Sequence, residues 1–346
     1  MRARVDLYGW IVCGLALSVF LLLGQATAAE PPRTNSLDEL YQKANREGGK
    51  LNLYVSLSTR AEEVIPQAFE KRFPGIKVDH VDATSDKLVA RAVAEARGGR
   101  VLGDVFGGTP GYLAQMREQQ LLADIVLPEA GIYPSHLKGS FWVATDTQFY
   151  IAGWNTNLVK KGEEPKQFED LADPKWLAKL IAEPRDFQLL MGLAKHKFHS
   201  DERASELMKR IAANKVEFHK GHSQLIEFLV AGQAPVCLTC YSHHFPPRMK
   251  KGAPIQPVIA EGVGEVGGAV SVLKGAPHPN TALLWARWAI SEEGQRVYAL
   301  AGETPAHPKV EPIEKIRPTT IYMLSAEDVK EFPKYEKLWK EIFRLR

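Results

Sequence analysis

Hydroxyl side chains follow three short apolar stretches in the first third of the sequence, each just before an amphipathic segment. The residues are the pair Ser58 and Thr59, the pair Thr84 and Ser85, and Thr109 after Gly108. Hydroxyls and free backbone N–H groups at a helix start are neutral donors, and the helix dipole adds about half a positive charge there. This chemistry favours the capture of a small anion over covalent catalysis.

A purely structural role is the alternative for each pair, because Ser and Thr also serve as ordinary N-cap residues. Thr109 precedes Pro110, a residue suited to the first position of a helix. Gly107 and Gly108 favour the ligand interpretation, because residues without side chains let a ligand approach the backbone closely.

Histidine and cysteine gather in a later third of the chain. The residues are His219, His222, Cys237, Cys240, His243 and His244. Imidazole and thiolate together suit zinc or copper. Against a metal site, Cys237 and Cys240 fall on an expected strand, where positions three apart point to opposite faces. We therefore expect no metal site here, and metal binding remains the alternative.

The spacing of Cys237 and Cys240 is also that of a redox pair, which normally opens a helix whose dipole lowers a thiol pKa. Here the segment follows Gly232 and Pro235 and has the pattern of a strand instead. Two interpretations stay open. The residues form either a buried thiol pair or a structural disulfide, and an oxidising compartment permits the second.

An exported hydrolase is the rival class of function. Ser58, His222 and Asp186 have the residue types of a nucleophile, a base and an orienting acid. However, Ser58 lacks the Gly-x-Ser-x-Gly pattern, and the sequence contains no His-Glu-x-x-His zinc pattern. We therefore expect a binding protein that is not an enzyme and carries no cofactor.

The N-terminus has the pattern of a secretory signal peptide. Arg2 and Arg4 precede an apolar run at 8–23 that ends in small residues at 26–29. The run is shorter than the roughly 20 residues of a spanning helix, so a retained anchor is the lesser alternative. Cys13 lies early in the run, unlike a lipid-attachment cysteine. We expect cleavage after residue 28 or 29 and release into the periplasm.

The composition is that of a folded protein with two ordinary domains. The 346 residues are 45% hydrophobic and 25% charged, and 44 basic residues nearly balance 41 acidic ones. The formal charge of +3 is spread along the chain without a basic block, so nucleic acid is not an expected partner.

The order of apolar and amphipathic segments predicts two α/β regions. A helix begins at a capping box after Ser36, and strands at 51–56, 76–81 and 104–106 alternate with helices, which predicts a parallel sheet. A second helix-capping box is expected at Thr59. A long strand region at 141–151 is the expected first crossing between lobes.

The second α/β region is expected between this crossing and a return crossing. Its strands are predicted at 179–182 and 235–241, with helices between them, and strands at 255–260 and 267–273 lead back through a glycine-rich turn. We therefore predict a signal peptide at 1–29, lobe I at 30–143 plus 268–346, and lobe II at 144–267. The apolar stripe in 325–346 is expected to pack on lobe I.

Four segments of the sequence resemble the iron(III)-type family of periplasmic substrate-binding proteins. They are Gly103–Phe106, Trp154–Val159, Phe168–Trp176 and the region from Lys274 to Gln295. The resemblance implies a two-lobed type II periplasmic binding protein fold with hinge crossings. It also implies that the lobes close over a ligand and deliver it to an inner-membrane ABC permease and its ATPase. We expect the protein to be a monomer.

The resemblance also indicates where a ligand would bind. Iron-binding members carry a His, a Glu and an adjacent Tyr pair at positions that match Ser58, Thr109 and the stretch around Tyr241. Ferric iron wants anionic oxygen ligands, which Ser, Thr and one Tyr supply too sparsely. We predict instead a small carboxylate, phosphonate or phosphate ester, with ferric iron or another transition metal as the alternative. The predicted ligand-binding residues are Ser58, Thr59, Gly108, Thr109, Arg185, His222 and Tyr241, with Arg60 as a further candidate for a bidentate contact.

Overall fold

The computed structural model describes residues 36–81, 83–313 and 316–346, with backbone only for Thr59 and Ala326. The predicted signal peptide at 1–29 and its cleavage point lie outside the described residues. Within the described ranges, every helix is too short or too polar to cross a membrane.

The first region is a small α/β unit, as the alternation of segments predicted. Strand β1 (Lys50–Val55) pairs in parallel with β2 (Lys77–His80) and with β3 (Val105–Gly108). The helices between and around them are α1 (Leu37–Arg46), α2 (Thr59–Arg72), α3 (Ser85–Arg97) and α4 (Pro110–Glu118). The Ser36 capping box is confirmed at the start of α1.

The strands of both regions belong to one mixed sheet, in the order β2-β1-β3-β9-β4-β7-β5-β6. The further strands are β4 (Val143–Asn155), β5 (Leu180–Ala182), β6 (Glu217–Phe218), β7 (Val236–Tyr241), β8 (Ile255–Pro257), β9 (Glu261–Val272) and β10 (Thr320–Met323). The parallel sheet predicted for the first region is confirmed for β1, β2 and β3. Strands β4 and β9 pair antiparallel with each other and with β7 and β3, and thereby join two parallel groups.

Helices of the second region cover the strands β5 and β7. They are α5 (Phe187–Gly192), continued by a π-helical turn at Leu193–Lys197, then α6 (Asp201–Ala213), α7 (His222–Val230), α8 (Phe245–Met249) and α11 (Phe332–Phe343). Helices α9 (Pro279–Ile290) and α10 (Glu292–Ala301) return to the first region, where α9 contacts α1 and α10 contacts α2.

Short 3₁₀ turns complete the chain. They lie at Pro128–Ile132, Ser135–Leu137, Phe168–Ala172, Pro174–Trp176, Ser242–His244 and Ala326–Glu331.

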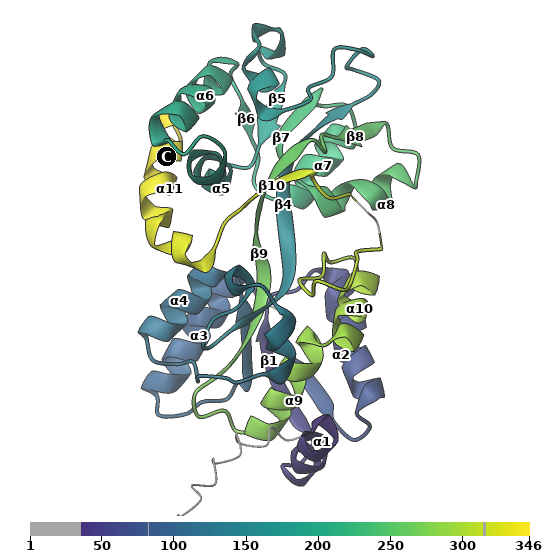
Figure 1. The fold of residues 1–346 in the computed structure, drawn as a ribbon, viewed down its shortest axis with the longest axis vertical. Coiled ribbons are helices and arrows are strands. Elements are labelled where there is room, and N and C mark those ends of the chain that lie inside the picture. Colours follow the sequence, from purple (N-terminus) through teal and green to yellow (C-terminus); the bar gives the residue numbers. More distant parts are fainter. Residues whose placement is uncertain (1–35, 82, 314–315) are drawn as a thin grey trace, which may run out of the picture. The chain divides into compact units, whose positions relative to one another are not determined.

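The fold has two lobes, each with its own apolar core. One cluster of buried side chains surrounds β1 to β3, and two others flank β5 and β7. Strands β4 and β9 serve both lobes: Val143 and Val270 lie in the first core, and Tyr150 and Val263 lie in the second. Figure 1 shows β4 and β9 side by side between the lobes. The predicted lobe limits at 143/144 and 267/268 fall inside these strands and stay a prediction.

The glycine-rich segment before Gly267 is part of strand β9, so the predicted turn was wrong. A Cβ atom on Gly262 would lie 2.6 Å from Pro318 Cγ, and one on Gly264 would lie 2.7 Å from Met323 Sδ. These glycines therefore let the chain on the β10 side approach β9 closely. The glycines are visible in the sequence, but the reason for them is the close approach of the chain on the β10 side, which the sequence pattern does not reveal.

The C-terminal apolar stripe packs on the second lobe, which corrects the expectation for 325–346. Helix α11 lies against α5 and α6. Trp339 is fully buried there and donates from Nε1 to the Pro184 carbonyl at 3.0 Å. The chain reaches this lobe because β10 pairs in parallel with β9 after α10, a third crossing that the helical spacing alone does not reveal.

Replacing Trp339 by Ala tests how far α11 stabilises the second lobe. Loss of a fully buried indole should lower the free energy of unfolding by about 3–5 kcal/mol. Urea unfolding followed by circular dichroism measures the change. Lys337→Ala on the same helix removes a largely exposed side chain and should cost less than about 0.5 kcal/mol. Equal effects of the two substitutions would show that α11 is not anchored through Trp339.

Candidate functional site

A cleft of about 860 Å³ lies between the two lobes. The loops after β1, β2 and β3 form its first-lobe wall, the start of α7 and the end of β7 form its second-lobe wall, and β4 with β9 forms part of its floor. The polar lining residues are Ser56, Ser58, Arg60, Ser85, Thr109, Thr145, Asp146, Gln148, His222, Ser223, Tyr241, His243, His244, Arg248 and Glu303.

Three helix N-termini form the first-lobe wall. Helix α2 has Ser58 as its N-cap, with Oγ accepting from the Ala61 N–H at 3.4 Å, so the expected capping box at Thr59 was one residue too late. Thr109 is the N-cap of α4, followed by Pro110 as predicted, and its side chain makes no capping hydrogen bond. Gly108 ends strand β3 and lines the cleft. The Thr59 side chain lies outside the described residues.

Two stacked rings form the centre of the second-lobe wall. The ring centroids of His222 and Tyr241 lie 3.6 Å apart, and the ring planes meet at an angle of 23°. The ring of His243 also stacks on that of Tyr241, with 5.5 Å between the centroids. His222 is the first residue of α7, and Gly221 before it has a φ of +95°, which favours glycine. Burial lowers the pKa of His243 to about 4, so this imidazole is neutral at pH 7.

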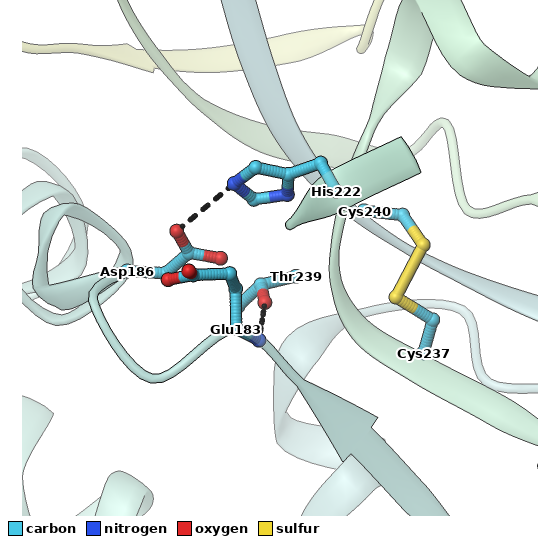
Figure 2. Close-up of a disulfide and its surroundings, with 6 residues drawn as sticks. All are labelled: Glu183, Asp186, His222, Cys237, Thr239 and Cys240. Atoms are coloured by element: carbon cyan, nitrogen blue, oxygen red, sulfur yellow. Dashed lines mark hydrogen bonds and ion pairs between the residues drawn. A yellow bond between two sulfur atoms is a disulfide. The ribbon is translucent and has the colours of Figure 1, made fainter. Parts of the chain in front are cut away.

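Asp186 fixes the position of His222 from behind the wall. Its Oδ1 lies 3.2 Å from His222 Nε2, and Figure 2 shows this contact with Thr239 and Glu183 close by. The carboxyl is almost fully buried, and burial raises its pKa, while His222 and the Thr239 hydroxyl act in the opposite direction. The ring of His222 is therefore held by a buried acid.

The three residues considered as a hydrolytic triad, Ser58, His222 and Asp186, do not assemble in this structure. His222 contacts Asp186, but the Ser58 hydroxyl donates to Glu303 Oε1 at 2.7 Å. A serine nucleophile needs its base within hydrogen-bond reach. Ser58 is bound to an acid of its own lobe instead.

Two carboxyl groups at the cleft floor were missed by the sequence analysis. Asp146 lies on β4 and Glu303 follows α10, and the chain after Glu303 runs beside β4, where Thr147 N–H donates to Thr304 O at 2.9 Å. Burial raises the pKa of Asp146 to about 7, and the negative charge of Glu303 is the second-largest cause of this rise. Burial also raises the pKa of Glu303.

A third buried acid lies on β9. Glu265 accepts hydrogen bonds at Oε1 from the Tyr150 hydroxyl and the Gln148 amide, both at 2.5 Å. Burial raises its pKa, and these two donors partly oppose the rise. The crossing strands therefore carry two acids, Asp146 on β4 and Glu265 on β9.

Two arginines, Arg60 and Arg248, line the cleft, and the predicted Arg185 does not. Arg60, in the first turn of α2, lines the cleft. Arg185 does not, because its guanidinium pairs with Glu183 at 2.6 Å and its side chain is 71% exposed. Arg248 lines the cleft, but Glu227 and the His244 carbonyl accept its hydrogen bonds. Among the predicted ligand residues, Ser58, Gly108, Thr109, His222 and Tyr241 line the cleft.

Cys237 and Cys240 form a disulfide, which decides between the two interpretations left open. Their side chains share one face of β7, so the expectation that they point to opposite faces was wrong. The described ranges contain no group of three or more His, Cys, Asp or Glu side chains arranged to hold a metal ion. The disulfide also removes both thiolates as metal ligands.

The fold and the cleft define a two-lobed solute-binding protein. The chain belongs to the bacterial extracellular solute-binding protein family, whose model matches residues 65–321. An uncharacterized protein of Haemophilus influenzae is 27% identical over 272 residues, which cover 74% of this chain and 77% of that protein. The family matches the resemblance predicted from the sequence.

Two solved structures have the same fold. Iron-bound HitA from Pseudomonas aeruginosa aligns with a TM-score of 0.71 and 18% identity, covering 85% of this chain and 99% of that one. The periplasmic binding protein AfuA from Actinobacillus pleuropneumoniae, with fructose-6-phosphate bound, aligns with a TM-score of 0.65 and 22% identity, covering 86% and 97%. These proteins bind chemically different ligands on one fold.

Asp146 should make the ligand-free protein less stable as pH rises. Its pKa is about 7 in the folded protein and near 3.8 when unfolded, so the folded state binds more protons between these values. Stability that depends on the protonated carboxyl is therefore lost as pH rises through this window. Asp146→Asn should raise the melting temperature at pH 8 more than at pH 5.

Differential scanning fluorimetry from pH 5 to pH 8 measures this effect. Asp79→Asn, on the exposed side of β2, is the matched control and should leave the pH dependence of the melting temperature unchanged. A parallel shift of the Asp146→Asn curve at every pH would contradict the assignment.

Proposed function

We propose that this protein is the solute-binding component of an ABC importer and captures a small organic anion in the interlobe cleft. The ligand is a carboxylate, a phosphonate or a phosphate ester, and the loaded protein delivers it to an inner-membrane permease and its ATPase. The observation that carries this proposal is the convergence of the α2, α3 and α4 N-termini and the start of α7 on one cleft. The periplasm, reached through the predicted signal peptide, is the proposed location.

The charge pattern of the first-lobe wall supports an anion. Backbone N–H groups at helix starts and the Thr109 hydroxyl supply neutral donors, and Arg60 adds a full positive charge in the cleft. AfuA, which shares the fold, is described with fructose-6-phosphate bound, so this architecture accommodates a phosphate ester in another protein.

The floor carboxyls favour an anion that also carries hydroxyl groups. Asp146 and Glu303 line the cleft, and burial raises the pKa of both, that of Asp146 to about 7. A carboxylate accepts from a ligand hydroxyl and a carboxylic acid also donates to it, and a polyol offers more such hydroxyls than inorganic phosphate. We therefore place phosphate esters of polyols, and hydroxy acids, ahead of inorganic phosphate.

Isothermal titration calorimetry against a panel of anions tests the proposal. The panel contains fructose 6-phosphate, citrate, phosphonoacetate and inorganic phosphate, with glucose as a neutral comparison. We expect saturable binding of one organic anion per protein, without turnover. Silence towards every anion, together with clear binding of glucose or of a metal ion, would defeat the proposal.

Arg60→Ala and Thr109→Val identify the anion contacts within that experiment. Loss of a hydrogen bond to a charged ligand costs about 1.5–3 kcal/mol, so each substitution should raise the Kd about ten- to a hundredfold. Arg210→Ala on the exposed face of α6 removes the same charge far from the cleft residues and should leave the Kd unchanged. A Kd that responds equally to Arg210→Ala would indicate only a general charge effect.

Ferric iron is a second candidate because the cleft offers more oxygen ligands than the sequence suggested. Asp146 and Glu303 on one side and Tyr241 on the other are hard ligands for this ion. Burial raises the pKa of Tyr241 well above its usual value, which opposes the phenolate that iron requires. Because the phenolate is disfavoured, we rank the organic anion ahead of ferric iron as the ligand.

Titration with ferric citrate separates the two candidates. Under the anion proposal, neither a tyrosinate-to-iron absorption band nor an iron-specific rise in melting temperature should appear beyond the effect of citrate alone. A band that Tyr241→Phe abolishes would replace the anion with iron.

A further inference from the structure

Strand β7 carries the disulfide on one face and part of the ligand wall on the other. Cys237 and Cys240 pack in the apolar cluster formed with α7, beside Leu225. Leu238 packs in the opposite cluster, and Tyr241 lies against that same cluster. Figure 2 shows the sulfur atoms on one side of the strand and Thr239 on the other.

This distribution departs from the alternation of a regular strand. With a period of two, residues 237, 239 and 241 would share one face, and residue 240 would lie on the other. The observed faces are offset by one position between Cys237 and Cys240.

A β-bulge produces the offset. Along β4, Ile151 and Gly153 are two positions apart, whereas their partners on β7, Cys240 and Cys237, are three positions apart. One extra residue on β7 therefore lies between the two pairs, and every side chain after it changes face. Tyr241 is the first cleft residue after the bulge.

The disulfide requires the bulge. The Cα atoms of Cys237 and Cys240 are 6.0 Å apart, within the ordinary range for a disulfide. In a regular strand the two sulfur atoms would lie on opposite faces and could not bond. A closed disulfide is therefore compatible with the bulged register and incompatible with the regular one.

Two contacts link the bulge to the ring stack in the cleft. Tyr241 stacks directly on His222 at 3.6 Å. Thr239 Oγ1 accepts from the Glu183 N–H at 3.1 Å, which ties β7 to the loop that carries Asp186. Asp186 in turn contacts His222, so both partners of the stack depend on the position of this strand.

We infer that the Cys237–Cys240 disulfide is a positioning element for ligand binding, because it holds β7 in the bulged register that places Tyr241 against His222 in the cleft. The structural part of this inference is independent of any ligand. Its effect on affinity rests on the proposed function, since Tyr241 and His222 are proposed ligand residues.

The first test measures the ring contact in the absence of ligand. Mature protein with ¹³C-labelled His and Tyr rings should show a nuclear Overhauser effect between His222 and Tyr241, assigned with the single-ring variants His222→Gln and Tyr241→Phe. Cys237→Ala combined with Cys240→Ala should remove the signal, as should reduction of the wild type with a phosphine. The reductant should have no effect on the double variant.

Leu229→Ala is the matched control for simple destabilisation. Leu229 is fully buried in the same cluster as the disulfide, so its loss lowers stability without opening the S–S bond. This variant should keep the ring signal. Persistence of the signal in the double cysteine variant, or its equal loss in Leu229→Ala, would overturn the inference. If the double variant fails to fold, reduction of folded wild type provides the same comparison.

The second test measures affinity with fructose 6-phosphate as the probe. Misplacing one hydrogen-bonding ring should raise the Kd about tenfold in the double variant and in reduced wild type. An unchanged Kd with a lost ring signal would overturn the link to binding while leaving the positioning of the rings in place. If wild type binds none of the panel anions but the ring signal still depends on the disulfide, the proposed function fails and the structural inference stands.

Discussion

The antiparallel pairing of β4 with β9 is the constraint on which the rest of the structure depends. These strands carry residues of both apolar cores, so each lobe is built on the same two strands. Their pairing is irregular on both sides of Asp146, and Gly267 and Gly268 lie opposite that irregularity. A Cβ atom on Gly267 would lie 2.3 Å from Asp146 Oδ2. The glycines thus leave room for an acid at the point where the strands pass between the lobes.

The position of this irregularity explains why the cleft has two kinds of chemistry. Loops at the carboxyl ends of β1 to β3 bring helix N-termini, which are donor-rich, to one wall. Strand β4 and the chain after α10 bring Asp146 and Glu303 to the floor, where burial raises the pKa of both. A ligand that contacts both must offer acceptors to the wall and hydroxyl groups to the floor. Such a ligand binds a closed form better than an open one only if it also contacts the second-lobe wall, where His222 and Tyr241 lie.

Local patterns in the sequence predicted the elements that depend on local physics. Apolar periodicity located most helices and strands, and cap chemistry located the start of α1 and of α4. The site residues at strand ends, such as Ser58 and Thr109, could be predicted for the same reason. The roles of Asp146 and Glu303, and the lobe on which α11 packs, could not be predicted, because each is defined by contacts with chain segments far away in the sequence. Arg185 was placed at a strand end correctly, but Glu183 two residues before it withdraws its charge from the cleft.

The error on the cysteines and the failure to find Asp146 share one physical cause. A period of two describes a strand only where the partner strand advances in step with it. Strand β4 is the partner in both cases, and it pairs irregularly with β9 and with β7. On β9 the irregularity makes room for Asp146, and on β7 it turns Tyr241 to the face that lines the cleft. The same long strand that joins the lobes therefore also sets, through its mismatched partners, which side chains a captured ligand meets.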